Sequence, residues 1–203
     1  LLGKEEEAYD AFYKATWSAE QQNMAYYYLA VIDCRRKNYA AALQMIEKSL
    51  NRNTHNIKSR ALKAIILRKL GLVKEATEWI SLNMEIDPFD YVSAFEAQKL
   101  GMTVLIDEKE LNRRNRRDNY NLLRAARDYA EAGCYCEAME VLNRADKDMA
   151  LIAYYKAYYL SKLVNDTEAV NMVKTAEKIK PDYCFPNDIE DIEVLKYAIS
   201  VDP

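Results

Sequence analysis

The side chains best suited to chemistry in this chain are four cysteines and a single histidine: Cys34, Cys134, Cys136, Cys184 and His55. Thiolates bind zinc, but a structural zinc site needs four ligands and usually places at least two residues between paired cysteines. Only one residue separates Cys134 from Cys136, and the other cysteines lie far away in the sequence. We therefore expect ordinary packing for these thiols, and we predict no metal and no other cofactor.

The sequence offers little for acid–base or nucleophilic catalysis. A single histidine leaves few schemes that depend on imidazole. There is no glycine-rich phosphate loop and no nucleophile elbow. Asp and Glu number 32 among 203 residues, so carboxylate pairs arise by chance and are not a signal in themselves. We predict that the chain is not an enzyme.

One basic run, NRRNRR from Asn112 to Arg117, could contact an anionic partner. It is bordered by acidic residues that include Asp107 and Asp118, and charge runs are usually exposed or internally paired helix faces. Both interpretations stay open for the run itself. The formal net charge of -3 and the pI of about 5.4 predict that the chain as a whole binds neither nucleic acid nor an anionic membrane.

The elements that position these residues follow a repeat. In the stretch GLVKEATEWISLNMEIDP, the turn residue Gly71 is followed by a small residue, Ala76, and a bulky one, Ile80. The pattern recurs 34 residues earlier and, with altered spacing, further along the chain. The small residues of the copies are Ala8, Ala42, Ala76, Ala138 and Ala169, and their turn residues are Gly3, Lys37, Gly71, Gly133 and Val164.

A 34-residue helix–turn–helix repeat with a small residue early in its second helix resembles the tetratricopeptide repeat. The phrases AYYYLAVIDCRRKNYAAAL, ALKAIILRKLG and PDYCFPNDIEDIEVL are similar to one branch of that family. In that branch, bacterial multidomain proteins carry a β-rich domain of unknown function, suspected to handle carbohydrate, before a tetratricopeptide array. The resemblance implies a scaffold region beside such a domain, and it carries over no catalytic residue.

We predict an all-α fold: a right-handed α-solenoid of stacked antiparallel helix pairs with one helical insertion. Half of the residues are hydrophobic and only 4 Gly and 4 Pro occur, which suits long helices. The small residues recur because a large side chain would hold two crossing helices apart. We expect residues 1–90 to hold a half repeat and two full repeats, 91–118 an irregular helical insertion, and 119–203 the last repeats and a final helix.

Two details of packing follow from the repeat. Arg60 stands where the repeat prefers Trp and Lys63 where it prefers Leu, so we expect Leu62 and Ile66 to supply the missing packing. The final helix carries an apolar stripe at helical spacing, formed by Ile189, Ile192, Leu195 and Ile199.

Three features of the sequence bear on the surroundings of the protein: its first residue, its apolar runs and its cysteines. It starts at Leu1 without a methionine, so we expect a fragment of a larger protein. No run of apolar residues is long enough to span a bilayer, and we predict no membrane partner. The four cysteines lack the pattern of a disulfide scaffold, which favours a reducing, cytoplasmic location.

Tyrosine is the most unusual excess, with 16 residues. Repeat geometry predicts a concave groove lined by the first helices, with both aromatic and cationic side chains. The candidate groove residues are Tyr27, Arg35, Arg68, Lys69, Tyr120, Arg127, Tyr154, Tyr158 and Lys162. Tyr and Arg dominate binding hot spots, so such a groove would suit an acidic or aromatic segment. The alternative is a groove filled by neighbouring helices.

We therefore predict a protein–protein interaction or assembly scaffold whose partner is a protein or peptide, or another domain of the same chain. Two alternatives stay open at this point. The chain could be a structural spacer, or an accessory lobe for a carbohydrate-active domain of the parent protein.

Overall fold

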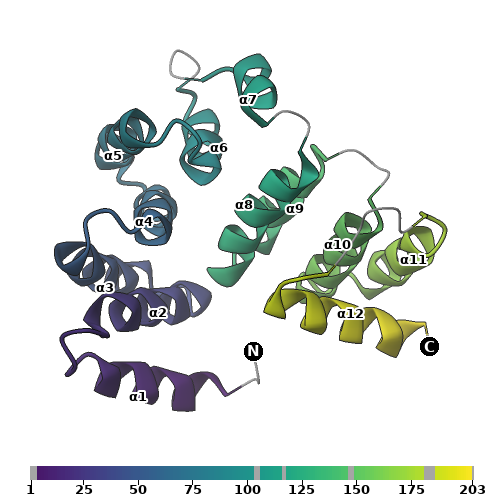
Figure 1. Ribbon diagram of the computed structural model, residues 1–203, viewed down its shortest axis with the longest axis horizontal. Helices are drawn as coiled ribbons and strands as arrows, with labels where there is room; N and C mark the ends of the chain where they lie inside the picture. Colours follow the sequence, from purple (N-terminus) through teal and green to yellow (C-terminus); the bar gives the residue numbers. More distant parts are fainter. Residues whose placement is uncertain (1–3, 103–105, 116–117, 146–148, 181–185, 203) are drawn as a thin grey trace. The chain divides into compact units, whose positions relative to one another are not determined.

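The computed structural model describes residues 4–102, 106–115, 118–145, 149–180 and 186–202. Within these residues every regular element is a helix, so the prediction of an all-α fold is confirmed (Figure 1). The helices are α1 (Glu5–Ala15), α2 (Gln22–Arg35), α3 (Tyr39–Arg52), α4 (Ile57–Lys69), α5 (Val73–Ile86), α6 (Tyr91–Lys99), α7 (Glu108–Asn115), α8 (Asn119–Glu131), α9 (Tyr135–Leu142), α10 (Ala150–Lys162), α11 (Asp166–Ala176) and α12 (Ile189–Val201).

The helices form two compact units. Unit 1 comprises Leu1–Arg114 together with Glu131–Gly133, and unit 2 comprises Asn115–Ala130 together with Cys134–Pro203. In unit 1 each of the helices α1 to α5 packs against the next along the chain, and α4 also packs against α6 (Figure 1). In unit 2, α10 packs against α9, α11 and α12. Each unit is a stack of helix pairs, as an α-solenoid requires.

A left-handed residue follows the first helix of each pair. Lys37, Gly71, Gly101, Gly133 and Val164 all have positive φ, between 60° and 74°. The φ angle at Gly71 is 73°, a conformation that costs glycine nothing and that ends a helix sharply. Four of these five turns were predicted from the repeat, and the fifth, at Gly101, was not. Gly3 lies outside the described residues.

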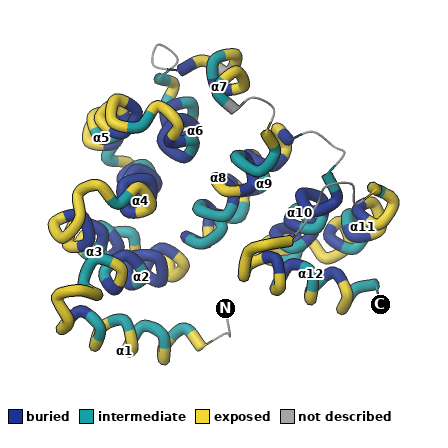
Figure 2. The backbone as a smooth tube through the Cα atoms, viewed as in Figure 1, coloured by how far each residue is buried: buried dark blue, intermediate teal, exposed yellow. Residues whose placement is uncertain are grey.

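The small residues of the repeat lie where the helices of a pair cross. Ala42, Ala76, Ala138 and Ala169 have no exposed surface, whereas Ala8 is half-buried. Helix α1 has no fully buried residue, because among the described helices it packs chiefly against α2 (Figure 2). Close approach of two backbones therefore explains the alanine spacing, since larger side chains overpack such a site.

The segment predicted as an insertion contains two helices, α6 and α7, joined through the left-handed turn at Gly101. Ile106 lies five residues after that turn, the place of the small residue in the other copies, and it is buried. Most of α6 is buried as well (Figure 2). The division of the chain at residues 90 and 118 stays a prediction.

Helix α12 buries a side that differs from its apolar stripe. Asp191, Val194 and Ala198 are buried, and Ala198 forms a core cluster with Ala157 and Val173. The predicted stripe is instead largely outside: the exposed fractions are 68% for Ile189, 51% for Ile192 and 66% for Ile199. The apolar stripe is therefore not the buried side, because Arg127 on α8 and Tyr155 on α10 hold Asp191 and fix the rotation of the helix.

Candidate functional site

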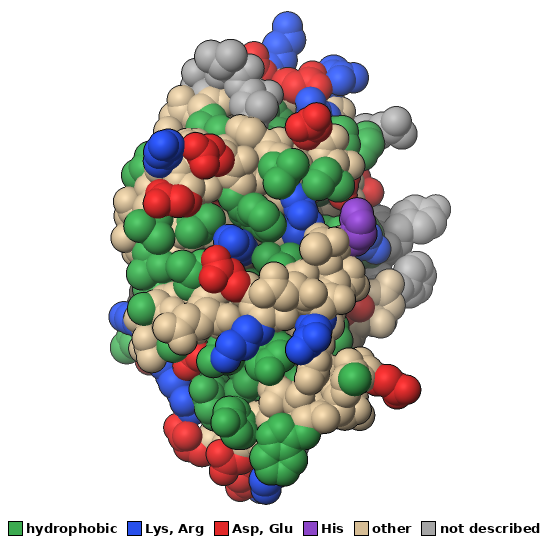
Figure 3. Space-filling view, turned by 90° about the vertical axis from the view of Figure 1, so that its left-hand side faces the viewer, with side chains coloured by type: hydrophobic (Ala, Val, Ile, Leu, Met, Phe, Trp, Pro, Cys, Tyr) green, Lys and Arg blue, Asp and Glu red, His purple; other side chains and the backbone are tan. Residues whose placement is uncertain are grey.

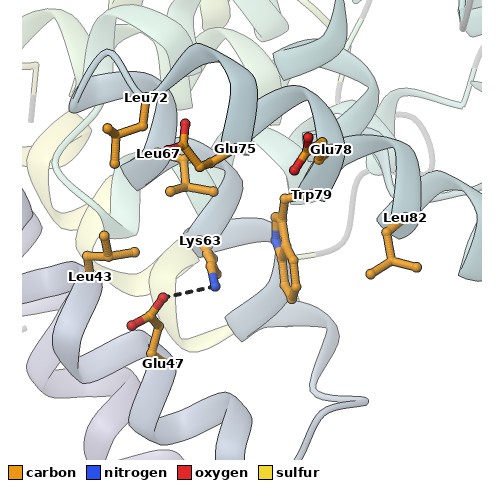
Figure 4. Close-up of a pocket in the computed structure, with 9 residues that line it drawn as sticks. All are labelled: Leu43, Glu47, Lys63, Leu67, Leu72, Glu75, Glu78, Trp79 and Leu82. Carbon is orange, nitrogen blue, oxygen red and sulfur yellow. Dashed lines mark hydrogen bonds and ion pairs between the residues drawn. The ribbon is translucent and has the colours of Figure 1, made fainter.

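A pocket of about 310 Å³ opens on unit 1 between the second helices α3 and α5, over the first helix α4. Its lining residues are drawn in Figure 4: Leu43, Glu47, Lys63, Leu67, Leu72, Glu75, Glu78, Trp79 and Leu82. Figure 3 shows hydrophobic side chains gathered on the face of the molecule that lies at the left of Figure 1, with charges of both signs among them. Pockets of this size can hold one or two side chains of a partner.

The pocket is apolar inside. Leu43, Leu67, Leu72 and Leu82 line it together with the ring of Trp79, which is half-buried. Leu67 is buried, while Leu82 keeps an exposed fraction of 42% at the edge. In α5, Glu75, Glu78, Trp79 and Leu82 follow the i, i+3, i+4, i+7 spacing, so they share one helix face. An exposed leucine beside a half-buried tryptophan is typical of a contact surface.

Two cations hold the indole ring of Trp79. The guanidinium carbon of Arg60 lies 4.7 Å and the ammonium of Lys63 lies 4.5 Å from its ring centroid. The indole N–H donates to the backbone carbonyl of Arg60 over 3.0 Å. Lys63 also donates to Glu47 over 3.1 Å, as the dashed line in Figure 4 shows. These contacts fix the ring orientation, so the pocket is preformed.

A buried polar junction anchors the helices behind the pocket, and it repeats with the period of the chain. Ser49 and Ser59 share a hydrogen bond of 2.9 Å, and 34 residues later Asn83 donates to Ser93 over 2.9 Å. The carboxylate of Asp90 caps α6 by accepting the backbone N–H of Ser93 over 3.0 Å. Burial raises the pKa of Asp90 above its ordinary value, and hydrogen bonds from Ser93 oppose that rise.

The candidate groove residues Tyr27, Arg35 and Arg68 of unit 1 have partners inside the unit. Tyr27 is buried, and its hydroxyl donates to Glu131 Oε2 over 3.0 Å. Arg35 is exposed and donates to the carbonyl of Glu131 over 2.8 Å. Arg68 forms a bidentate ion pair with Glu96, and Lys69 is half-buried. Glu96 was not predicted from the sequence, and it neutralises the guanidinium of Arg68, which we expected to face a partner.

In unit 2, the candidate Arg127 lies at the centre of a polar network. Its guanidinium donates to Asp188, to Asp191 over 2.6 Å and to the Tyr155 hydroxyl over 2.9 Å. Tyr155 in turn donates to Asp191 over 2.6 Å. Burial raises the pKa of Tyr155. Burial also acts to raise the pKa of Asp191, but the hydrogen bonds from Tyr155 and the backbone outweigh it and lower that pKa.

The remaining candidates lie on α8 and α10 of unit 2. Tyr120 is half-buried, and its backbone N–H donates to Asp118 over 2.9 Å. Tyr154 packs against the core cluster of Ala157, Val173 and Ala198. The ring of Tyr158 meets that of Tyr197 on α12 edge to face at 5.9 Å, and the exposed Lys162 lies 4.7 Å from the Tyr158 centroid. Neighbouring helices thus cover part of these tyrosines.

The described cysteines differ in burial. Cys134 is buried and Cys136 is exposed, whereas Cys184 lies outside the described residues. In the described part of the chain, no three His, Cys, Asp or Glu side chains come together as metal ligands.

The described part of the basic run is internally paired. Arg113 and Arg114 both donate to Glu110, and Arg114 also donates to the carbonyl of Pro88 over 2.8 Å. The hydrogen bonds from the two arginines lower the pKa of Glu110 to about 2. Arg116 and Arg117 lie outside the described residues. The internal pairing is therefore seen for the first half of the run.

Trp79 was not among the predicted site residues, because repeat geometry places the groove on the first helices and Trp79 lies on a second helix. The sequence nevertheless carries a signal for a site at Trp79. Arg60 and Lys63 depart from the repeat preferences, and both place their charge on the ring of Trp79. Leu62 and Ile66 are buried and supply the packing that we expected from them. The departures therefore coincide with the position of a tryptophan on the second helix of the pair.

No protein-family model matches the chain. No curated protein matches it either. Among the helices that the structure describes, none is long and apolar enough to cross a lipid bilayer.

Several solved structures are similar to the chain. TTC0263, a thermophilic TPR protein in Thermus thermophilus, is 21% identical over 88% of this chain and 98% of its own, with a TM-score of 0.43. YrrB, a TPR protein with an unusual peptide-binding site, is 19% identical over 92% and 98%, with a TM-score of 0.43. The MamA protein is 14% identical over 83% and 99%, with a TM-score of 0.43. The chain itself has the helix-pair α-solenoid fold that its repeat spacing predicts.

Proposed function

We propose that the chain is a protein-interaction scaffold that binds a segment of a partner protein at the Trp79 pocket. The observation that carries the proposal is a preformed apolar pocket, about 310 Å³ in volume, with a fixed tryptophan inside and an exposed leucine at its edge. Tryptophan is enriched in binding hot spots, and buried apolar contacts supply most of the affinity there. A stack of helices holds such a pocket rigid, which reduces the entropy lost on binding.

A second proposal is that the first helices of a single unit bind an acidic or aromatic segment. In unit 1 the exposed Arg35 supports it, and in unit 2, taken by itself, the exposed Lys162 and the half-buried Tyr154 and Tyr158 support it. The ion pairs of Arg68 and Arg127 weigh against it, because an acidic partner would have to compete with carboxylates already in place. The Trp79 pocket needs no such exchange, and we therefore rank it first.

The alternatives are a structural spacer and an accessory lobe for a carbohydrate-related domain of the parent protein. A spacer needs only the repeat core, so nothing in its function would require Leu82 at the surface. An accessory lobe would use a surface that faces the neighbouring domain. Both alternatives predict that substitutions at the pocket edge leave peptide binding by the isolated chain unchanged.

The test is a selection of random peptides displayed on phage against the whole chain, followed by affinity measurements on synthetic copies of the selected peptides. Leu82→Ala should weaken binding about 5- to 10-fold, since the lost apolar contact is worth roughly 1 kcal/mol. Ile86→Ala, on the same helix and also exposed but outside the pocket lining, is the matched control. Equal affinities for the wild type and Leu82→Ala would place binding elsewhere and refute the proposal.

A further inference from the structure

We propose that the segment bound at the Trp79 pocket is basic, with an apolar residue that enters the pocket and Lys or Arg residues beside it. This inference rests on the function proposed above and adds the chemistry of the partner. It differs from the sequence-based expectation of an acidic partner, which concerned the groove of first helices. The charges around the pocket edge carry the inference.

The edge of the pocket is acidic. Glu75 and Glu78 are exposed on the same face of α5, and within the described residues neither carboxylate has an ion-pair partner. Glu47, on α3, lies across the pocket, and its side chain is 51% exposed. An extended or helical segment crossing from α3 to α5 would therefore pass carboxylates on both sides.

Among the cations nearby, Lys63 offsets the charge of Glu47, whereas Glu75 and Glu78 form no ion pair within the described part of the chain. The side chain of Lys63 is only 17% exposed, and its ammonium is engaged by Glu47 and by the ring of Trp79. Arg60 is buried against the same ring, with Asp90 as an opposing charge behind it. Lys74 is exposed on α5 but does not line the pocket. The most exposed charges at the pocket mouth are therefore the carboxylates.

The carboxylates and the leucines of the pocket would contact different parts of the bound segment. Because Arg60 and Lys63 already lie over the ring of Trp79, a partner cation would find its attraction in Glu75 and Glu78. The leucines leave room for an aliphatic or aromatic anchor. Exposed carboxylates attract Lys and Arg over several ångströms and repel acidic segments, so they control the choice of partner and the association rate.

The experiment uses the same peptide selection and determines the net charge of the pocket-dependent peptides. These are the peptides whose binding becomes weaker in the Leu82→Ala variant. These peptides should be enriched in Lys and Arg. Glu75→Gln and Glu78→Gln should each weaken them about 2- to 5-fold at low salt, and the effect should shrink at high salt. Glu85→Gln, an exposed carboxylate on α5 outside the pocket lining, is the matched control and should change nothing.

The outcomes separate this inference from the proposed function. Pocket-dependent peptides that are neutral or acidic, or that bind Glu75→Gln and Glu78→Gln as well as the wild type, would overturn the basic partner and leave the function standing. A selection without any pocket-dependent peptide would overturn both. Self-association of the wild type in sedimentation experiments, abolished by Leu82→Ala, would assign the pocket to a second copy of the chain and would also contradict the inference.

Discussion

Arg68 on α4 and Glu96 on α6 form a bidentate ion pair, in which both Nε and one terminal nitrogen of the guanidinium donate to the carboxylate. The side chain of Glu96 has no exposed surface, and that of Arg68 is 18% exposed. The pair joins the first helices of neighbouring helix pairs. Its two charges are therefore part of the unit 1 core, although the sequence suggests a surface cation at Arg68.

Arg68→Ala should destabilise the chain by about 3 kcal/mol, because it leaves the carboxylate of Glu96 buried beside the vacated site. The measurement is chemical denaturation followed by circular dichroism. Glu6→Ala is a suitable control, since the ion pair between Glu6 and Arg36 is largely exposed and its loss should have no measurable effect. The double variant Arg68→Leu, Glu96→Leu should recover much of the loss. Similar midpoints for Arg68→Ala and Glu6→Ala would show that the pair is not part of the core.

Val164→Gly should stabilise the chain. Val164 has a φ of 60° and is 86% exposed, so its β-branched side chain strains the turn without contributing packing. Removing the strain should add about 1 kcal/mol to the free energy of unfolding, reduced by the greater entropy of glycine in the unfolded chain.

Gly71→Ala is the reverse substitution at an equivalent turn, and it serves as the control. Gly71 has a φ of 73° with open space around the Cβ position, so the cost of the substitution is conformational and should be about 1 kcal/mol. Thermal unfolding followed by circular dichroism reports both changes. A Val164→Gly variant that melts below the wild type would mean that the side chain has a packing role that outweighs its strain.

Asp33→Asn should make stability less dependent on pH. Burial raises the pKa of the Asp33 carboxyl, although Arg36 opposes the rise, and one of its oxygens is buried without a hydrogen bond in the described residues. Because the folded pKa is above the unfolded one, stability is highest when the group is protonated, falls as the pH rises through the unfolded and then the folded pKa, and is lowest at neutral pH.

The substitution should therefore raise the free energy of unfolding at neutral pH, by up to about 1 kcal/mol, and the gain should disappear in acid. Denaturation at a series of pH values measures the difference. Asp10→Asn, an exposed position on α1, serves as the control and should follow the wild type. A gain for Asp33→Asn that is the same at every pH would reject ionisation as its cause.

The repeat could be predicted from the sequence because one physical constraint acts on each copy. Ala42 and Ala76 have no room for a larger side chain, and the turns after the first helices need a left-handed residue, so both signals recur at a fixed spacing. The left-handed turn at Gly101 was not predicted because the bulky Ile106 stands five residues after it, where the other copies have a smaller alanine, and the buried Leu111 is one position later than Ile80 is in its copy. The spacing rule misses a turn when the residues that follow it change in size and in register.

The candidate site was harder to predict because its contacts join positions far apart in the chain. Nothing local indicates that Arg68 faces Glu96, which lies 28 residues away, or that the Trp79 ring lies against Lys63. The rotation of α12 is a similar case. Its isoleucines give the more apolar stripe, yet hydrogen bonds to Asp191 decide which side is buried. Hydrogen bonds between buried polar side chains can outweigh the hydrophobic pattern in deciding which face of a helix is buried. The sequence alone does not show which side chains form these bonds.

The most direct test of the Trp79 pocket is the indole N–H signal of Trp79 in a ¹⁵N-labelled sample titrated with a selected peptide. The chain has 2 tryptophans, and Trp17 is 77% exposed on the turn after α1, so it provides an internal reference. The indole N–H of Trp79 donates to the Arg60 carbonyl beside the pocket and should report occupancy. We predict that the Trp79 signal shifts in proportion to bound peptide while that of Trp17 stays in place. A saturated complex in which the Trp79 signal has not moved would contradict the account.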